Sequence, residues 1–155
     1  SQQAEQARAQ VSVIDSQINE AELNLQQARG QTQGQIFQAE ANLAAAESQF
    51  NQAQAQLAAA QSDLKLAKVT RDRYASLRQE GAVSQERLDQ AQTQLEAAQA
   101  TLKARQAGVS TAQKQVNAAQ GALTQAQTSR LNPGISRTRI QALQKQLESA
   151  QSQLQ

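Results

Sequence analysis

Hydrophobic positions recur every seven residues along two long stretches of the chain. In the first stretch a row of alanines is followed, four positions later each time, by a row of larger residues: Ala39, Ala46, Ala53, Ala60 and Ala67, with Leu43, Phe50, Leu57 and Leu64. The second stretch has a large row and a small row of its own: Leu88, Leu95, Leu102, Val109, Val116 and Leu123, with Ala91, Ala98, Ala112, Ala119 and Ala126. Arg105 alone departs from the pattern. This spacing predicts coiled-coil helices that each bury one narrow stripe.

The two stretches become complementary when the chain folds back at Gly81. Residues equidistant from Gly81 then face each other, so Leu64 faces Ala98 and Ala60 faces Leu102. Large residues opposite small ones allow two helices to pack densely without voids. The sequence therefore predicts an all-α fold, a long antiparallel two-helix coiled-coil hairpin.

A tight turn is predicted at residues 80–84, which we call the tip. Gly81 can take the left-handed conformation that ends a helix, and Ser84 is a good N-cap. Val83, which precedes the cap, can pack on Leu88 as a hydrophobic staple. These residue types indicate two helix ends joined by a short loop.

A break in the second arm is predicted near residues 131–135, where Pro133 and Gly134 follow each other. Beyond it, three-four spacing resumes and is matched in the first arm: Ile140, Leu143, Leu147, Ala150 and Leu154, with Val11, Ile14, Ile18, Ala21 and Leu25. Counting heptads across the break predicts about three residues looped out near Pro133. Gly30 and Gly34 lie at the same level of the first arm, so we expect a joint there, with a bend or fraying in both helices.

The organisation that follows is a single hairpin domain over residues 1–155. Its parts are an ascending arm at 1–79 with a possible joint at 30–34, the tip at 80–84, and a descending arm at 85–130 and 136–155. Aromatic residues are 2% of the chain and there is one proline, a composition that suits long helices better than a globular core. Because the repeat is unfinished at both ends, we expect this chain to be a fragment of a larger protein.

The chain contains no cysteine and no histidine. Thiolate and imidazole ligands, cysteine nucleophiles and Ser-His-Asp triads are thereby excluded. Carboxylate pairs such as Glu20 with Glu22 are typical of a solvated helix surface. We therefore expect no enzyme activity, no catalytic residue, no cofactor and no metal site.

Charge is distributed unevenly between the two arms. Residues 1–50 carry six acidic and two basic side chains, a net of −4, whereas residues 103–155 carry seven basic and one acidic, a net of +6. This asymmetry is compatible with attraction inside the hairpin and with a head-to-tail ring of copies. With a formal net charge of +2 and no exposed aromatic platform, nucleic acid is not an expected partner. Without a long apolar run, no direct membrane contact is expected either.

Residues 71–89, RDRYASLRQEGAVSQERLD, place Arg73, Leu77 and Ser84 at the spacing R-x3-L-x6-S around the expected turn. This motif, set between two heptad arms, resembles the hairpin tip of periplasmic adaptor proteins, also called membrane fusion proteins, of the HlyD and AcrA type. The joint near Pro133 and the Gln- and Ala-rich composition further resemble the DevB-like branch, which serves ABC exporters.

The resemblance implies a role in a tripartite efflux or secretion system. In that family the hairpin projects from lipoyl and β-barrel domains, the parent protein is anchored at the inner membrane, and copies assemble into a hexameric funnel in the periplasm. The tip contacts a TolC-like outer-membrane channel. Carried across, Arg73 would supply polar contacts to the channel, Leu77 an apolar knob and Ser84 a contact at the start of the returning helix.

Each motif residue also has an ordinary structural interpretation. Ser84 is explained as an N-cap, Leu77 as the last residue of the buried stripe, and Arg73 as a solvated charge. The alternative to an adaptor hairpin is therefore a structural coiled-coil spacer without a docking role.

Overall fold

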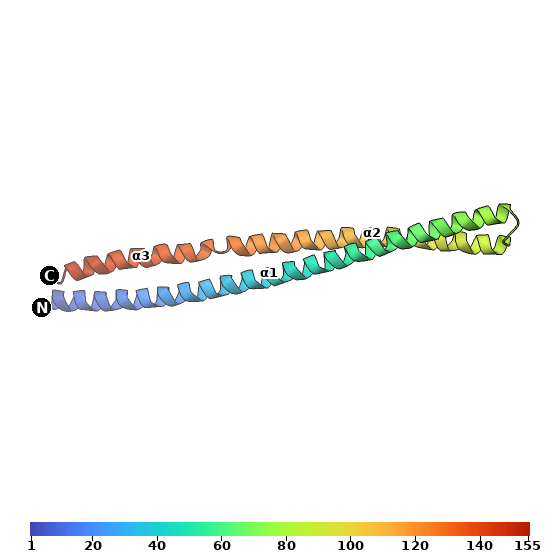
Figure 1. Ribbon diagram of the computed structural model, residues 1–155. Helices are drawn as coiled ribbons and strands as arrows, with labels where there is room; N and C mark the ends of the chain where they lie inside the picture. Colours follow the sequence, from blue (N-terminus) through green and yellow to red (C-terminus); the bar gives the residue numbers. More distant parts are fainter. The chain divides into compact units, whose positions relative to one another are not determined.

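The computed structural model describes the backbone of residues 1–155 and the side chains of all of them except Asn132. The helices are α1 (Gln2–Gln79), α2 (Gln85–Thr128) and α3 (Leu131–Ser152), and the described residues form no strand (Figure 1). The prediction of an all-α helical hairpin is confirmed. Long helices form because Ala, Gln and Leu dominate the sequence and all have high helix propensity.

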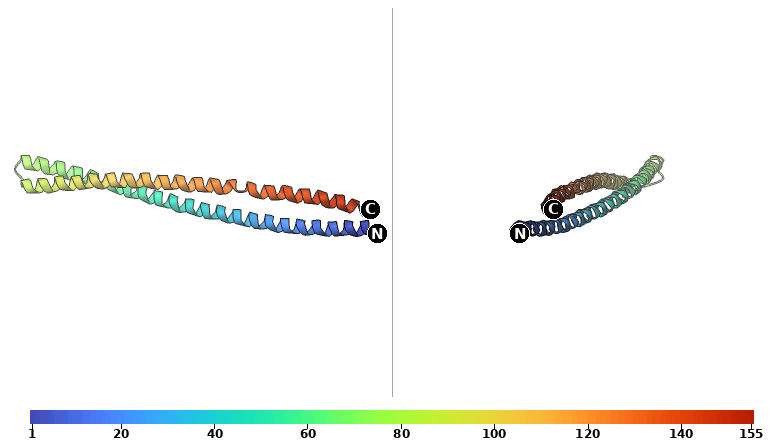
Figure 2. Two further views of the ribbon diagram at one scale, coloured as in Figure 1. Left: turned by 180° about the vertical axis from the view of Figure 1, so that it is seen from behind. Right: turned by 90° about the vertical axis from the view of Figure 1, so that its left-hand side faces the viewer.

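The chain divides into two compact units. Unit 1 comprises residues 1–41 and 121–155, and unit 2 comprises residues 42–120. In unit 2 the end of α1 lies antiparallel beside α2, and the tip joins them (Figures 1 and 2). In unit 1 the first half of α1 lies beside the last turns of α2 and beside α3, and the two chain ends are neighbours (Figure 2).

The core of unit 2 is the seam, by which we mean the two pairs of heptad rows predicted above. Its members in this unit are all buried or half-buried: Leu43, Ala46, Phe50, Ala53, Leu57, Ala60, Leu64 and Ala67 on α1, and Leu88, Ala91, Leu95, Ala98, Leu102, Val109, Ala112, Val116 and Ala119 on α2. Ala91 and Leu95 are only 3% exposed. Because each helix buries one stripe, the remaining faces stay in contact with solvent.

The core of unit 1 uses the residues that resume the repeat after the break. Ile14, Ile18 and Ala150 form a buried cluster, and Val11, Leu143 and Leu147 pack against it. The pairing of these two segments, predicted from the three-four spacing alone, is thus confirmed. Leu154 is an exception, because it lies beyond the end of α3 and is 41% exposed.

The break in the second arm lies slightly upstream of its predicted position and is shorter. Only Ser129 and Arg130 separate α2 from α3, so the expectation of about three looped-out residues is wrong. Pro133 and Gly134 belong to the first turn of α3. Proline lacks an N–H and crowds the carbonyl four residues earlier, here that of Ser129, so the helix is interrupted before the proline. The first turn of a helix accommodates proline because its N–H groups have no partner within the helix.

The first arm shows no interruption at the predicted joint. Helix α1 continues through Gly30 and Gly34, so the expected fraying at residues 30–34 does not occur. A glycine in a helix interior costs only about 1 kcal/mol relative to alanine, which the neighbouring helix formers offset. Both glycines are exposed on α1, and a Cβ at either would meet no atom within 4 Å.

Candidate functional site

The tip is built by two helix caps in close succession. Gly81 has φ +78°, and two backbone hydrogen bonds close the end of α1: the Gly81 N–H donates to the Arg78 carbonyl at 3.0 Å and the Ala82 N–H to the Leu77 carbonyl at 2.8 Å. This pair of bonds is the Schellman motif, which satisfies carbonyls that the helix end would leave unpaired. The left-handed conformation predicted for Gly81 is thus observed.

Ser84 begins the returning helix as an N-cap. Its Oγ accepts a hydrogen bond from the Arg87 N–H at 3.3 Å, and its carbonyl accepts from the Leu88 N–H at 3.4 Å. Val83 and Leu88 are both half-buried, as a hydrophobic staple requires. The connection therefore spans only the five residues from Glu80 to Ser84 and is fixed to a helix at each end.

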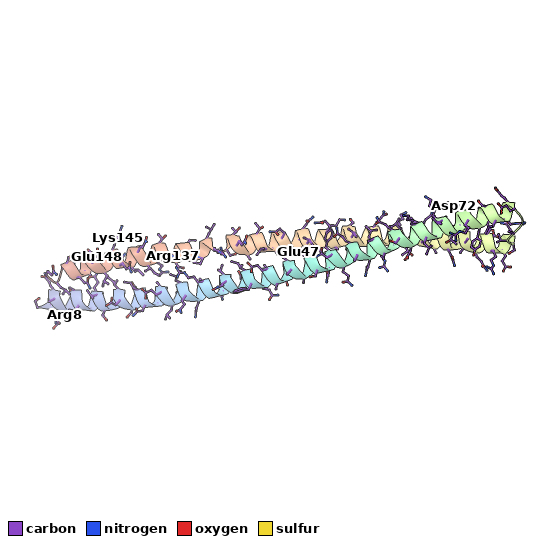
Figure 3. The ribbon with its side chains drawn as sticks, in the orientation of Figure 1. Arg8, Glu47, Asp72, Arg137, Lys145 and Glu148 are labelled. Carbon is purple, nitrogen blue, oxygen red and sulfur yellow. The ribbon has the colours of Figure 1, made fainter. Side chains whose placement is uncertain are left out.

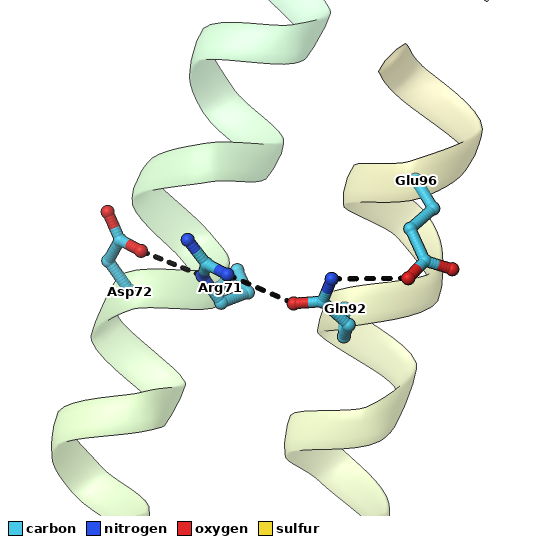
Figure 4. A network of polar contacts seen from close by, with 4 residues as sticks. All are labelled: Arg71, Asp72, Gln92 and Glu96. Atoms are coloured by element: carbon cyan, nitrogen blue, oxygen red, sulfur yellow. Dashed lines mark hydrogen bonds and ion pairs between the residues drawn. The ribbon is translucent and has the colours of Figure 1, made fainter. Parts of the chain in front are cut away.

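Polar side chains connect the two arms just below the turn. The Arg71 Nη1 donates to the Gln92 Oε1 at 3.0 Å, and Gln92 in turn donates to the Glu96 Oε1 at 3.2 Å (Figure 4). The Arg71 Nε also contacts Asp72 Oδ1 at 2.8 Å as an ion pair. This network holds α1 and α2 together at the level of Arg71.

A second connection lies closer to the turn. The Arg78 Nε donates to the Gln85 Oε1 at 3.4 Å, and Gln85 donates to the Asp89 Oδ1 at 2.9 Å. Both cross-arm bonds were absent from the sequence interpretation, although Arg71 and Gln92 lie almost symmetrically about Gly81. Long side chains can adopt many rotamers, so their partners cannot be derived from position alone.

The three motif residues occupy different environments around the turn. Leu77 is half-buried, and its carbonyl caps the end of α1. Ser84 is exposed but its Oγ is engaged in the N-cap. Arg73 is exposed, and among the described side chains its guanidinium has no hydrogen-bond or ion-pair partner. Arg73 is therefore the motif residue whose side chain has no role inside the hairpin.

Two large apolar side chains on α1 were not recognised as surface features from the sequence. Leu66 is 66% exposed and Val69 is 48% exposed. They lie seven and four residues before Arg73, which places all three on one face of the helix. The available signal was a second three-four spacing, on the face of α1 opposite the seam.

Many charged side chains project from the helices toward solvent, and those described form no ion pair across the arms. Examples are Glu47 on α1 and Arg137 on α3 (Figure 3). Among the described residues the ion pair formed is that of Arg71 and Asp72, both on α1. The acidic and basic arms are therefore not joined by direct ion pairs within the described part of the chain.

A shallow groove of about 530 Å³ lies in unit 1 beside the start of α3. Ile36 and Phe37 line it from α1, and Pro133 and Gly134 line it from α3. Pro133 is buried, whereas Phe37 is 63% exposed. Over the residues with described side chains there is no group of acidic, histidine or cysteine residues that could hold a metal. In the same residues no helix is long and apolar enough to cross a membrane.

The hairpin geometry agrees with a known family of helical hairpins. Residues 49–118, which lie entirely in unit 2, match the family described as "RND MFP, alpha-helical hairpin domain", where MFP denotes membrane fusion protein. The matched part of the chain, residues 49–118, is therefore an α-helical hairpin of the membrane fusion protein type, a class also called periplasmic adaptors. These are non-enzymatic transport adaptors, so the prediction that the chain is not an enzyme is confirmed.

A solved structure, described as that of the periplasmic adaptor protein EmrA, has the same fold. The TM-score is 0.69 at 12% sequence identity, and the match covers 97% of this chain. It covers 48% of the EmrA chain, so the present chain spans about half the length of that protein. No curated protein sequence matches the chain significantly.

Proposed function

We propose that the chain is the hairpin of a periplasmic adaptor that links an inner-membrane transporter to a TolC-like outer-membrane channel. The parent protein would be anchored at the inner membrane, its hairpins would pack into a hexameric funnel, and the tip would dock on the channel. The observation that carries this proposal is the match of residues 49–118 to the membrane fusion protein hairpin, with an exposed Arg73 beside the turn. An ABC exporter is proposed as the transporter because the Gln- and Ala-rich sequence resembles the DevB-like branch.

Arg73, Leu77 and Ser84 are the proposed docking residues. An arginine without an internal partner is suited to forming charge-assisted hydrogen bonds with carbonyl or carboxylate oxygens of another protein. Leu77 and Ser84 flank the turn and lie on its two sides, one at the end of α1 and one at the start of α2. The turn therefore presents a cation, an apolar side chain and a hydroxyl within one short segment.

Single substitutions in the full-length protein test the docking role. Arg73→Ala is expected to reduce channel-dependent export about tenfold or more, equivalent to at least about 1.4 kcal/mol of binding, with unchanged helix content by circular dichroism. Lys103→Gln, which also removes one exposed cation but lies away from the turn on α2, serves as the control. Normal export in the Arg73, Leu77 and Ser84 variants would leave the structural spacer as the function.

Ser84 needs two substitutions because it also caps α2. Ser84→Ala removes the cap and is expected to cost about 1 kcal/mol of stability, whereas Ser84→Asp keeps a good N-cap and changes only the exposed group. If both variants lose export while only Ser84→Ala loses stability, docking is the cause. Export lost in Ser84→Ala alone would assign Ser84 a purely structural role.

A further inference from the structure

The groove beside the start of α3 is built entirely within unit 1. It has a volume of about 530 Å³, and roughly 300–1,000 Å³ is typical of sites for small molecules. Its lining residues on α1 recur at three-four spacing and therefore share one face of that helix: Arg29, Thr32, Gln33, Ile36, Phe37 and Glu40. The opposite wall consists of Arg130, at the junction between α2 and α3, and of the first turns of α3. Each arm thus contributes one wall.

The groove contains a threonine without a partner inside the chain. Thr32 is 7% exposed, and within the described part of the chain its hydroxyl forms no hydrogen bond. Thr138, by contrast, donates to the Gly134 carbonyl at 3.1 Å, a bond that threonines inside helices often make. No described side-chain oxygen that is cut off from solvent lacks a partner, so the Thr32 hydroxyl must open into the groove. A polar group that is nearly buried and unpaired is suited to a hydrogen bond with a ligand.

Apolar side chains line the middle of the groove. Ile36 and Pro133 are buried, whereas Phe37 and Leu131 are exposed, Leu131 at 72%. Neighbouring large apolar side chains that stay in contact with water are a mark of binding surfaces. A ligand with an apolar body would cover both of them.

The charged residues of the groove are mainly cationic. Arg29, Arg130 and Arg137 line it together with one carboxylate, that of Glu40. Among the described residues none of the three guanidinium groups has a hydrogen-bond or ion-pair partner. An unpaired guanidinium is suited to two parallel hydrogen bonds with a carboxylate. The charge of the groove therefore favours an anionic ligand.

Two of the arginines lie at the same end of the groove as Thr32. The arms are antiparallel, and Leu147 packs against the cluster that contains Ile18. Counting equal numbers of residues from these two toward the tip brings Arg29 within one residue of the level of Arg137. Thr32 follows Arg29 by about one helical turn. We call Arg29, Thr32 and Arg137 the polar end of the groove.

The other end of the groove, toward the tip, has no excess of positive charge. Glu40 and Arg130 lie on this side and carry opposite charges. The apolar part is therefore bounded by charged residues in both directions along the arms. A docked helix would need apolar contacts over about two turns, whereas α1 offers only the neighbours Ile36 and Phe37 here. The short apolar part suits a hydrocarbon chain better than a helix.

We propose that the groove binds a small amphipathic anion, a carboxylate on a single hydrocarbon chain, with its head at the polar end and its chain over the apolar side chains. The carboxylate oxygens accept hydrogen bonds from the two guanidinium groups and from the Thr32 hydroxyl. The chain covers Phe37 and Leu131. This site goes beyond the adaptor role and does not depend on docking at the tip.

Calorimetric titration of the full-length protein with decanoate tests the polar end. Arg137→Gln is expected to raise the Kd for decanoate at least about tenfold, because a charge-assisted contact is lost. Lys145→Gln removes one exposed cation of α3 that does not line the groove, and should leave the Kd unchanged. Absence of decanoate binding, or the same Kd in both variants, would overturn the proposal.

The apolar part is tested with a second matched pair. Phe37→Gln is expected to raise the Kd for decanoate at least about fivefold, because apolar contact with the chain is lost. Leu23→Gln removes an apolar side chain of α1 that is 61% exposed and outside the groove, and should have little effect. Circular dichroism should show unchanged helix content in both variants. If Phe37→Gln weakens self-association in sedimentation but not decanoate binding, the groove is a contact between copies and the proposal is wrong.

The chemistry of the head group separates this site from a general apolar surface. Decyltrimethylammonium has the same chain with a cationic head, and acetate has the same head without the chain. Both are expected to bind at least about tenfold more weakly than decanoate. Thr32→Val removes the hydroxyl and should weaken decanoate binding about threefold or more. Equal affinity for decanoate and decyltrimethylammonium would refute the role of the arginines and with it the site.

Discussion

At the scale of single residues, Gly81 is the position where the backbone conformation most restricts which amino acid can be accommodated. Its φ of +78° lies in the left-handed region, which a residue with a Cβ occupies only at a cost. A Cβ built there would meet no atom within 4 Å, so the cost is purely conformational. Gly108 also has open space around it, but it lies inside α2 with a negative φ.

Replacing these two glycines should therefore have opposite effects. Gly81→Ala is expected to lower the free energy of unfolding by about 1–2 kcal/mol, and Gly108→Ala to raise it by about 0.5–1 kcal/mol. Urea titrations followed by circular dichroism measure both. Destabilisation of similar size in both variants would contradict the assignment of the turn.

At the scale of helices, the seam explains why large and small rows alternate. Ala60 is 4% exposed on α1, and Leu102, its symmetric partner about Gly81, is half-buried on α2. There is no room for two large side chains at one level of two closely packed helices. Exchanging the large and the small residue of one pair should therefore keep the two helices well packed.

A double-mutant cycle tests this pairing. Ala60→Leu alone is expected to cost about 1–3 kcal/mol through overpacking, and addition of Leu102→Ala should recover most of the loss. Leu95→Ala, which is not a partner of Ala60, is the control: it should add its own penalty of about 2–4 kcal/mol. Recovery by Leu95→Ala in place of Leu102→Ala would show a different register.

The helices and the seam could be predicted from the sequence because heptad spacing alone decides which residues share one face of a helix. The position of the break was predicted too far downstream. Pro133 disturbs the helix at the carbonyl four residues earlier, so the helix is interrupted at Ser129 and Arg130. The sequence also did not place the cross-arm bond between Arg71 and Gln92, which depends on rotamers. For the tip motif, the structure supplies the exposure of Arg73, the comparison with known families supplies the hairpin class, and docking stays a prediction.

At the scale of the whole molecule, cohesion comes from apolar packing and amide hydrogen bonds more than from ion pairs. The ion pair among the described residues joins Arg71, which is half-buried, with its exposed neighbour Asp72 on the same helix. Contacts between the arms include the uncharged amide groups of Gln56, Gln85 and Gln92 as acceptors. Exposed ion pairs contribute little and are screened by salt.

Stability should consequently depend only weakly on ionic strength. Raising sodium chloride from about 0.05 to 1 M, which shortens the screening length several-fold, is expected to shift the Tm by no more than about 5 °C. Thermal unfolding followed by circular dichroism measures the shift. A large fall in Tm with salt would mean that attraction between the acidic and basic arms holds the hairpin together.

The caps at Gly81 and Ser84 also bear on how quickly the tip could meet a partner. A loop of five residues anchored at both ends by hydrogen bonds has little conformational entropy left to lose on binding. Its encounter with another rigid surface would be limited by diffusion and orientation, without a slow ordering step. The lifetime of such a complex would then depend on the contacts made after arrival and not on folding of the loop.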